Sequence, residues 1–158
     1  MSRLTCFFVT AVLVLTCASC HRTADVRARV CPLGSSMAVL YWPQVNGCVP
    51  CELPALESLS RASTESPDIR LTLVLPDGAA NIADRMGVAW HGSVVRLDRR
   101  SYEQQVKSTP VPRVEVWDRG GRLLLLKTIP PNLMQAAALG DEVRWTKARA
   151  TPANKIGG

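Results

Sequence analysis

Aromatic side chains and histidines are scarce in this chain. Of its 158 residues, 5% are Phe, Trp or Tyr and two are His. Proteins that bind single-stranded nucleic acid stack the bases on aromatic side chains. This chain has few aromatic side chains for that purpose. The net charge of +6 is spread along the sequence, without a block of five or more like charges. We therefore expect no nucleic acid among the partners.

The sequence also lacks an apolar run that would cross a bilayer comfortably, which takes about 20 residues. The apolar run Phe7–Leu15 follows a positive Arg3 and precedes small residues and Cys20. This order of positive residue, apolar segment and small residues is typical of an export signal. We therefore predict a signal peptide over residues 1–19.

The same stretch resembles a bacterial lipoprotein signal, in which small residues precede a cysteine that is lipidated and becomes the mature N-terminus. Ala18-Ser19-Cys20 fits the last three positions of that pattern. The resemblance implies a lipid anchor on Cys20, a tether over residues 20–35, and a periplasm-facing place in the bacterial cell envelope. Cys17 is a second candidate for the lipidated residue, and ordinary cleavage nearby with a soluble product is the other alternative.

The rest of the chain has the composition of one globular domain, since the sequence is 47% hydrophobic and 20% charged. We place this domain at residues 36–149 and a flexible tail at residues 150–158. Buried-type apolar runs alternate with segments of helical periodicity. They predict strands at Met37–Trp42, Ile69–Leu75, Ser93–Leu97, Arg113–Asp118 and Arg122–Thr128, and helices at 50–62, 79–86, 101–106 and 132–147. This order favours an α/β fold with a central mixed β-sheet flanked by helices.

The motif Cys48-Val49-Pro50-Cys51 lies between the first predicted strand and the first predicted helix. A helix N-terminus carries partial positive charge, which lowers the pKa of a cysteine there and favours the thiolate. A thiolate attacks a disulfide, and a second cysteine nearby resolves the mixed disulfide. In an oxidising compartment the pair could instead form a static structural disulfide.

The two cysteines could also be half of a zinc site, which needs four ligands. The remaining candidates are Cys31, His21 and His91, and they provide neither a second Cys-x-x-Cys motif nor a spaced His pair. We therefore expect no metal site, a surface position for His91 and an incidental role for Cys31.

The first strand, the Cys48–Cys51 motif and the following Glu52–Leu59 resemble exported thioredoxin-like proteins of the TlpA/ResA kind. A second resemblance lies in Val111–Arg122, where the family has a cis-proline and then a strand ending in an Asp-x-x-Gly turn. The two patterns occur in the family's order and cover roughly residues 36–145. The resemblance implies a thioredoxin-like fold.

It also implies an activity, because these relatives are membrane-tethered thiol-disulfide oxidoreductases. Cys48 and Cys51 would be the catalytic pair, and Val49 and Pro50 would complete the redox motif. No cofactor is implied. The implied partners are exported protein thiols and disulfides, including cytochrome or oxidase assembly proteins, together with an upstream redox partner.

The client-binding residues follow from the second resemblance. Pro112 occupies the place of the family's cis-proline, since its spacing to Asp118 and Gly121 agrees. Val111, the residue before it, would offer backbone groups to an extended client peptide, in a strand-like mode that tolerates many client sequences.

The motif departs from the family in its spacing. Trp42 lies six residues before Cys48, where the family has four, and Pro54 lies three residues after Cys51, where the family has five. Either the loop gained two residues while the helix start lost two, or the motif is displaced in the usual frame. The second case would move the sulfurs away from Pro112.

The sequence also departs from the family at the position of a buried acid. Many thioredoxins keep a carboxylate under the disulfide as a proton acceptor, and its expected place in the first strand is apolar here. Glu52 directly follows Cys51, and we expect its side chain to be solvated and to have no role in proton transfer.

Two further function classes stay open. One is a non-catalytic thioredoxin-like lipoprotein that binds proteins or carries metal, with a static disulfide. The other is a peroxiredoxin-like thiol peroxidase, suggested by Trp42-Pro43 before Cys51, although the threonine that should precede the reactive cysteine is missing.

Overall fold

The computed structural model describes residues 37–45, 48–80, 84, 87, 90–129 and 133–150. Several sequence predictions lie outside these residues. They are the signal peptide, the tether with Cys20, the candidate cysteines Cys17 and Cys31, residues 151–158 of the tail, and most of the helix expected at 79–86.

A five-stranded mixed sheet is the centre of the domain, as the sequence predicts. Its order is β3-β2-β1-β4-β5, with β1, β2 and β3 parallel and both β4 and β5 antiparallel to their neighbours. The strand bounds are β1 Met37–Trp42, β2 Ile69–Pro76, β3 Ser93–Leu97, β4 Arg113–Asp118 and β5 Leu123–Thr128. All six residues of β1 are buried, because this central strand is covered on both faces.

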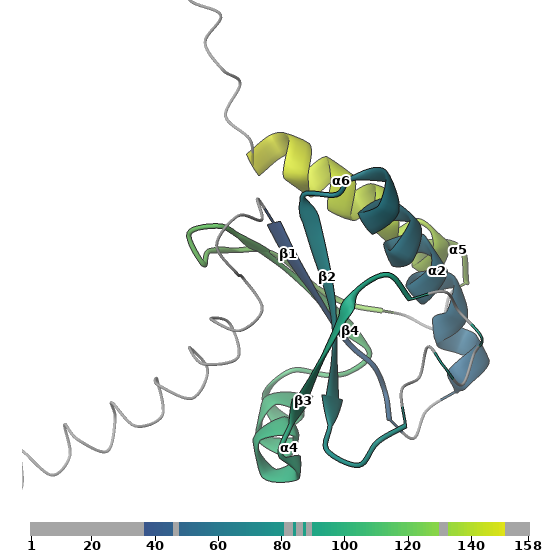
Figure 1. Cartoon of the computed structure of the whole chain (residues 1–158), viewed down its shortest axis with the longest axis vertical. Coiled ribbons are helices and arrows are strands. Elements are labelled where there is room, and N and C mark those ends of the chain that lie inside the picture. Colours follow the sequence, from purple (N-terminus) through teal and green to yellow (C-terminus); the bar gives the residue numbers. More distant parts are fainter. Residues whose placement is uncertain are drawn as a thin grey trace, which may run out of the picture.

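Helices cover the two faces unequally (Figure 1). Three pack against one face, and α4 packs against the other. Their bounds are α2 Val49–Glu65, α5 Leu133–Ala137, α6 Leu139–Ala150 and α4 Arg99–Ser108. Successive side chains of β1 point to opposite faces of the sheet. Val39 and Tyr41 therefore belong to the core under α2, and Leu40 and Trp42 belong to the core under α4.

The last predicted helix is interrupted at Ala138, which separates α5 from α6. Gly140, at the start of α6, lies against α2, where a Cβ atom would be 2.3 Å from the Ser58 carbonyl oxygen. The Ser58 hydroxyl accepts a 2.9 Å hydrogen bond from the Gly140 N–H and donates one of 2.6 Å to the Ala137 carbonyl. Ser58 therefore ties α2 to both C-terminal helices at the point where they meet.

One predicted helix start differs from the structure, and one predicted turn agrees with it. Helix α4 begins at Arg99 because its N-cap is Asp98 and not Ser101. The Asp98 carboxylate accepts a 2.9 Å hydrogen bond from the Ser101 N–H. The β4–β5 turn is as expected: the Asp118 carboxylate accepts from the Arg122 N–H at 2.8 Å, and Gly121 has a positive φ of 76°. Within the described part of the chain, no helix is both long and apolar enough to cross a membrane.

Candidate functional site

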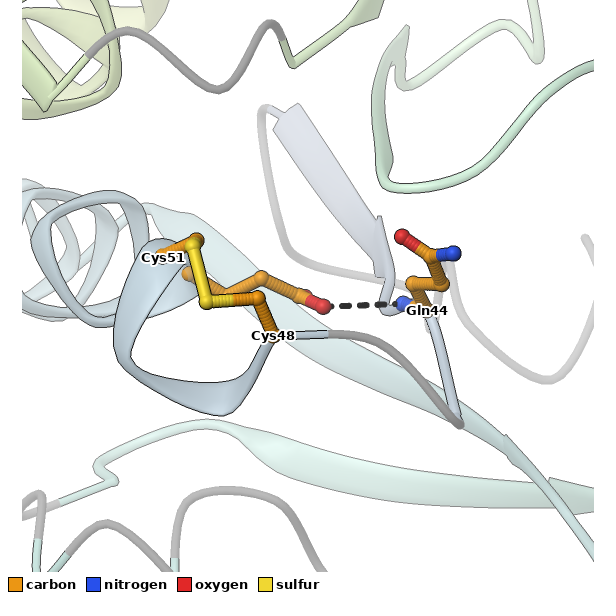
Figure 2. The surroundings of a disulfide bond; sticks show 4 residues. Gln44, Cys48 and Cys51 are labelled. Atoms are coloured by element: carbon orange, nitrogen blue, oxygen red, sulfur yellow. Dashed lines mark hydrogen bonds between the residues drawn. A yellow bond between two sulfur atoms is a disulfide. The ribbon is translucent and has the colours of Figure 1, made fainter.

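The two motif cysteines are joined in a disulfide at the start of α2 (Figure 2). Their sulfurs are 2.08 Å apart and their Cα atoms 5.3 Å apart. Cys48 is the N-cap of the helix, Pro50 lies in its first turn, and the Cys51 N–H donates to the Cys48 carbonyl at 3.0 Å. A proline is favourable here because the first helical N–H groups have no partner within the helix.

The two cysteines differ in accessibility. Cys48 is exposed, and Cys51 is half-buried. Cys48 therefore is the sulfur that a second protein can approach, while Cys51 is held behind it by the first helical turn.

The helix start places the motif. Because α2 begins at Val49, Cys48 is the N-cap although it lies six residues after Trp42 in sequence. The pair therefore lies at a helix N-terminus.

The Val111–Pro112 peptide bond is cis. Trp42, the last residue of β1, pairs in register with Arg113, the first residue of β4. The loop that leads from β1 to Cys48 and the peptide that leads into β4 therefore lie at the same end of the sheet. Val111 packs against the cluster around Trp42, and among the described residues no hydrogen bond joins this peptide to the disulfide.

Glu52 is buried, so the prediction of a solvated side chain is wrong. It is 2% exposed. Because α2 starts at Val49, Glu52 is in helical phase with Ala55, Leu56 and Leu59, which all face the sheet and are buried. That spacing was visible in the sequence and is the signal that could have located this carboxyl group.

Two donors hold the Glu52 carboxyl group. The Tyr41 hydroxyl donates to Oε2 at 2.5 Å, and the Gln44 backbone N–H donates to Oε1 at 3.1 Å. The second bond is the dashed line in Figure 2, beside the disulfide. The group thus connects the end of β1, the loop after it and the first turn of α2.

Burial shifts the titration of this pair. Loss of solvation raises the pKa of Glu52, and the hydrogen bonds from Tyr41 and Gln44 oppose that rise. Burial and the neighbouring carboxylate raise the pKa of Tyr41 well above its usual value, so Tyr41 stays a donor. A carboxyl group with a raised pKa beside a cysteine can take up and return a proton nearer to neutral pH.

The face under α4 holds a buried cation that the sequence analysis missed. Arg113 is 1% exposed, and its Nε donates to the Glu115 carboxylate at 2.8 Å. Its Nη1 donates at 2.7 Å to the carbonyl of Thr109, three residues before the cis-proline. Nearby, the Tyr102 hydroxyl donates to the Pro43 carbonyl at 2.9 Å. Side chains from α4 and β4 thereby fix both loops at this end of the sheet.

A half-open cavity of about 210 Å³ adjoins this cluster, lined by residues of β1, α4, β4 and β5 that include Trp42, Arg113 and Leu126. Among the described residues, no group of three or more His, Cys, Asp or Glu could hold a metal ion. His91 is exposed.

No protein-family model and no curated protein sequence matches this chain. Solved structures do resemble it. One is a secreted disulfide oxidoreductase of Mycobacterium tuberculosis, homologous to E. coli DsbE, with a TM-score of 0.52 and 15% identity over 72% of this chain and 81% of that one.

Two other solved structures also resemble it. A thiol:disulfide interchange protein from Bacteroides sp. gives a TM-score of 0.54 with 13% identity, covering 77% of this chain and 79% of the other. A thioredoxin-like protein from Porphyromonas gingivalis gives 0.52 with 16% identity, covering 73% and 76%. With the sheet order, the disulfide at the start of α2 and the cis peptide before β4, these similarities show that the chain has the thioredoxin-like fold found in thiol:disulfide oxidoreductases.

Proposed function

We propose that this protein is a thiol-disulfide oxidoreductase that exchanges disulfides with exported client proteins through Cys48-Val49-Pro50-Cys51. The observation that carries the proposal is an accessible disulfide at a helix N-terminus of a thioredoxin-like fold.

In the reduced protein, the Cys48 thiolate attacks one sulfur of a client disulfide. The client's S–S bond breaks, a mixed disulfide with Cys48 forms, and the other client sulfur leaves as a thiolate. Cys51 then loses its proton and attacks the Cys48 sulfur, which releases the second client thiolate and closes the Cys48–Cys51 bond. Two electrons reach the client, whose thiolates take up two protons. The reverse sequence oxidises a client dithiol.

Position assigns the two roles. Cys48 caps the helix, where the partial positive charge of the N-terminus stabilises a thiolate. Cys51 is half-buried and directly precedes Glu52. We assign the proton that leaves Cys51 to the Glu52 carboxylate, which becomes neutral in the step.

The client would bind beside the disulfide at the Val111–Pro112 peptide. Both groups lie at the same end of the sheet, as the pairing of Trp42 with Arg113 requires. An extended client segment can use backbone hydrogen bonds there, which would allow many client sequences.

Each turnover that reduces a client leaves the pair oxidised, so an upstream redox partner must restore it. The sequence supports export and a lipid anchor on Cys20, and client proteins would then be envelope proteins, including cytochrome or oxidase assembly factors. Labelling with a lipid precursor tests the anchor: Cys20→Ser should lose the label, and loss only in Cys17→Ser would assign the anchor to Cys17 instead.

A redox titration of the purified protein, followed by thiol alkylation and intact mass, tests the activity. We expect reversible two-electron behaviour of Cys48 and Cys51 at a potential between about −120 and −270 mV. Cys48→Ser should abolish exchange with a disulfide-bonded test protein, and Cys31→Ser is the matched control that should leave it unchanged. A pair that stays oxidised below about −300 mV would mark a static disulfide and contradict the proposal.

A further inference from the structure

We infer that Tyr41 is a positioning residue for Glu52: its hydroxyl fixes the buried carboxyl group and sets the pH at which that group ionises. The inference rests on the proposed function only where it connects this ionisation to disulfide exchange. Its geometric basis is independent of any activity.

The contact joins two deeply buried side chains. Tyr41 is 0% exposed and Glu52 is 2% exposed, and their oxygens are 2.5 Å apart. Water is therefore excluded from the carboxyl group, and the ionised form depends on donors supplied by the protein. A short hydrogen bond to a carboxylate is stronger than one between neutral groups.

The two carboxyl oxygens have separate donors. Oε2 accepts from Tyr41 and Oε1 accepts from the Gln44 backbone N–H. The Gln44 donor is a backbone group, so among the described residues Tyr41 supplies the side-chain hydrogen bond to this carboxyl group. A carboxylate oxygen has about two acceptor positions, so the contact with Tyr41 leaves Oε2 a second acceptor position.

Few other ionisable groups face this carboxyl group. Tyr102 approaches from α4, and its pKa is raised to about 12 by burial, so it stays neutral at physiological pH. Arg113 lies on the same face of the sheet as Tyr102, and its guanidinium forms an ion pair with the Glu115 carboxylate. On the same helix as Glu52, Cys51 has a titratable thiol only after the disulfide is reduced. Among the ionisable groups named here, the Tyr41 hydroxyl is therefore the one that donates a hydrogen bond to the carboxyl group and stabilises its ionised form.

The test is the variant Tyr41→Phe, which removes one oxygen and keeps the ring. The carboxyl stretch of Glu52 is followed by infrared difference spectroscopy across pH in the oxidised protein, and Glu52→Gln assigns the band. Because a donor to the ionised form is lost, the titration midpoint should move upward by about one pH unit, a tenfold change in the dissociation constant.

Thr146→Val is the matched control. It also removes one buried hydroxyl, but that hydroxyl donates to the Glu142 carbonyl within α6, which does not titrate. Its Glu52 midpoint should equal that of the wild-type protein. Replacing Tyr41 by 3-fluorotyrosine supplies a second variant that keeps the hydroxyl and the fold. Its more acidic hydroxyl donates more strongly, so the midpoint should move downward.

A midpoint that is unchanged in Tyr41→Phe and in the 3-fluorotyrosine protein would overturn the inference. The pH profile of exchange with a disulfide-bonded test peptide is the second readout, and in Tyr41→Phe it should move to higher pH together with the infrared midpoint. A moved infrared midpoint with an unmoved exchange profile would support the role of Tyr41 in the ionisation of Glu52 and contradict the assignment of Glu52 as the proton acceptor for Cys51. A wild-type protein without exchange would contradict the proposed function, while the infrared titration would still decide the role of Tyr41.

Discussion

The guanidinium of Arg113 lies over the indole ring of Trp42, 4.3 Å from the ring centroid, and the two residues face each other across the β1–β4 pair. These are the strand ends from which the chain leaves toward Cys48 and arrives from the cis-proline. The same guanidinium holds the Thr109 carbonyl and the Glu115 carboxylate. The Arg113 side chain therefore connects the end of β1, which leads to Cys48, with the segment that contains the cis-proline.

Replacing Arg113 by leucine should destabilise the protein by about 3 to 5 kcal/mol, the usual cost of breaking a buried ion pair from one side. The change leaves the largely buried Glu115 carboxylate without its cation and the Thr109 carbonyl without its donor. Urea unfolding measures the loss. Arg99→Leu, which removes a largely exposed ion pair with Glu103, is the control and should cost less than about 1 kcal/mol. Equal losses in the two variants would refute the assigned role.

The exposure of Cys48 and the half-buried position of Cys51 predict opposite phenotypes for their serine variants. Cys51→Ser should accumulate a mixed disulfide with the client, because the resolving sulfur is absent. Cys48→Ser should form none. Non-reducing electrophoresis and intact mass distinguish the two results, and a trapped complex in Cys48→Ser would reverse the assignment of attacking and resolving sulfurs.

Stability should depend on pH through Glu52. Its pKa is raised in the folded protein, so the folded state retains a proton that the unfolded state has lost. The corresponding stabilisation is fully present below the ordinary glutamate pKa and is lost as pH rises through the folded value. In urea unfolding, the wild-type protein should therefore lose stability relative to Glu52→Gln between pH 4 and neutral pH.

Asp118→Asn supplies a comparison of opposite sign. Hydrogen bonding from the Arg122 backbone lowers the pKa of Asp118, so its contribution is present above the ordinary aspartate pKa and is lost as pH falls. Relative to Asp118→Asn, the wild-type protein should lose stability toward acid. The same trend for both variants would contradict the Glu52 prediction.

Gly140→Ala should destabilise the packing of α6 on α2 by about 1 to 3 kcal/mol, as overpacking usually does. The added methyl group would meet the Ser58 backbone carbonyl at 2.3 Å, and backbone cannot rotate aside as a flexible side chain would. Thermal unfolding measures the effect. Ala148→Ser, an exposed change on the same helix, is the control. A Gly140→Ala protein as stable as the wild type would show that the helices separate without cost.

The sequence predicts the scaffold well and the surroundings of the site less well. An apolar run locates β1 because this strand is buried along its whole length, and the Asp118–Gly121 turn is set by local geometry. The cis peptide before Pro112 was expected from the resemblance, and the placement of Cys48 at a helix start follows from the position of the motif between a predicted strand and a predicted helix.

The misplaced residues are those whose surroundings come from distant parts of the chain. The burial of Glu52 follows from its helical spacing to buried residues of α2, but its donor Tyr41 lies on a strand and is not indicated by that spacing. Arg113 was passed over because its stacking partner and its carbonyl acceptor become neighbours only after β1, α4 and β4 assemble. Buried polar groups depend on such partners, which local patterns do not contain.

The hydrogen bond from Tyr102 to Pro43 spans 59 positions of sequence. A chain made from its N-terminus presents both motif cysteines well before the helix that fastens their loop exists. During that interval the pair is two ordinary thiols on an unfinished chain, open to any oxidant it meets. The side chain that holds the Pro43 carbonyl is thus added late in synthesis, and a chain cut short before Arg99 would keep both cysteines while lacking this contact.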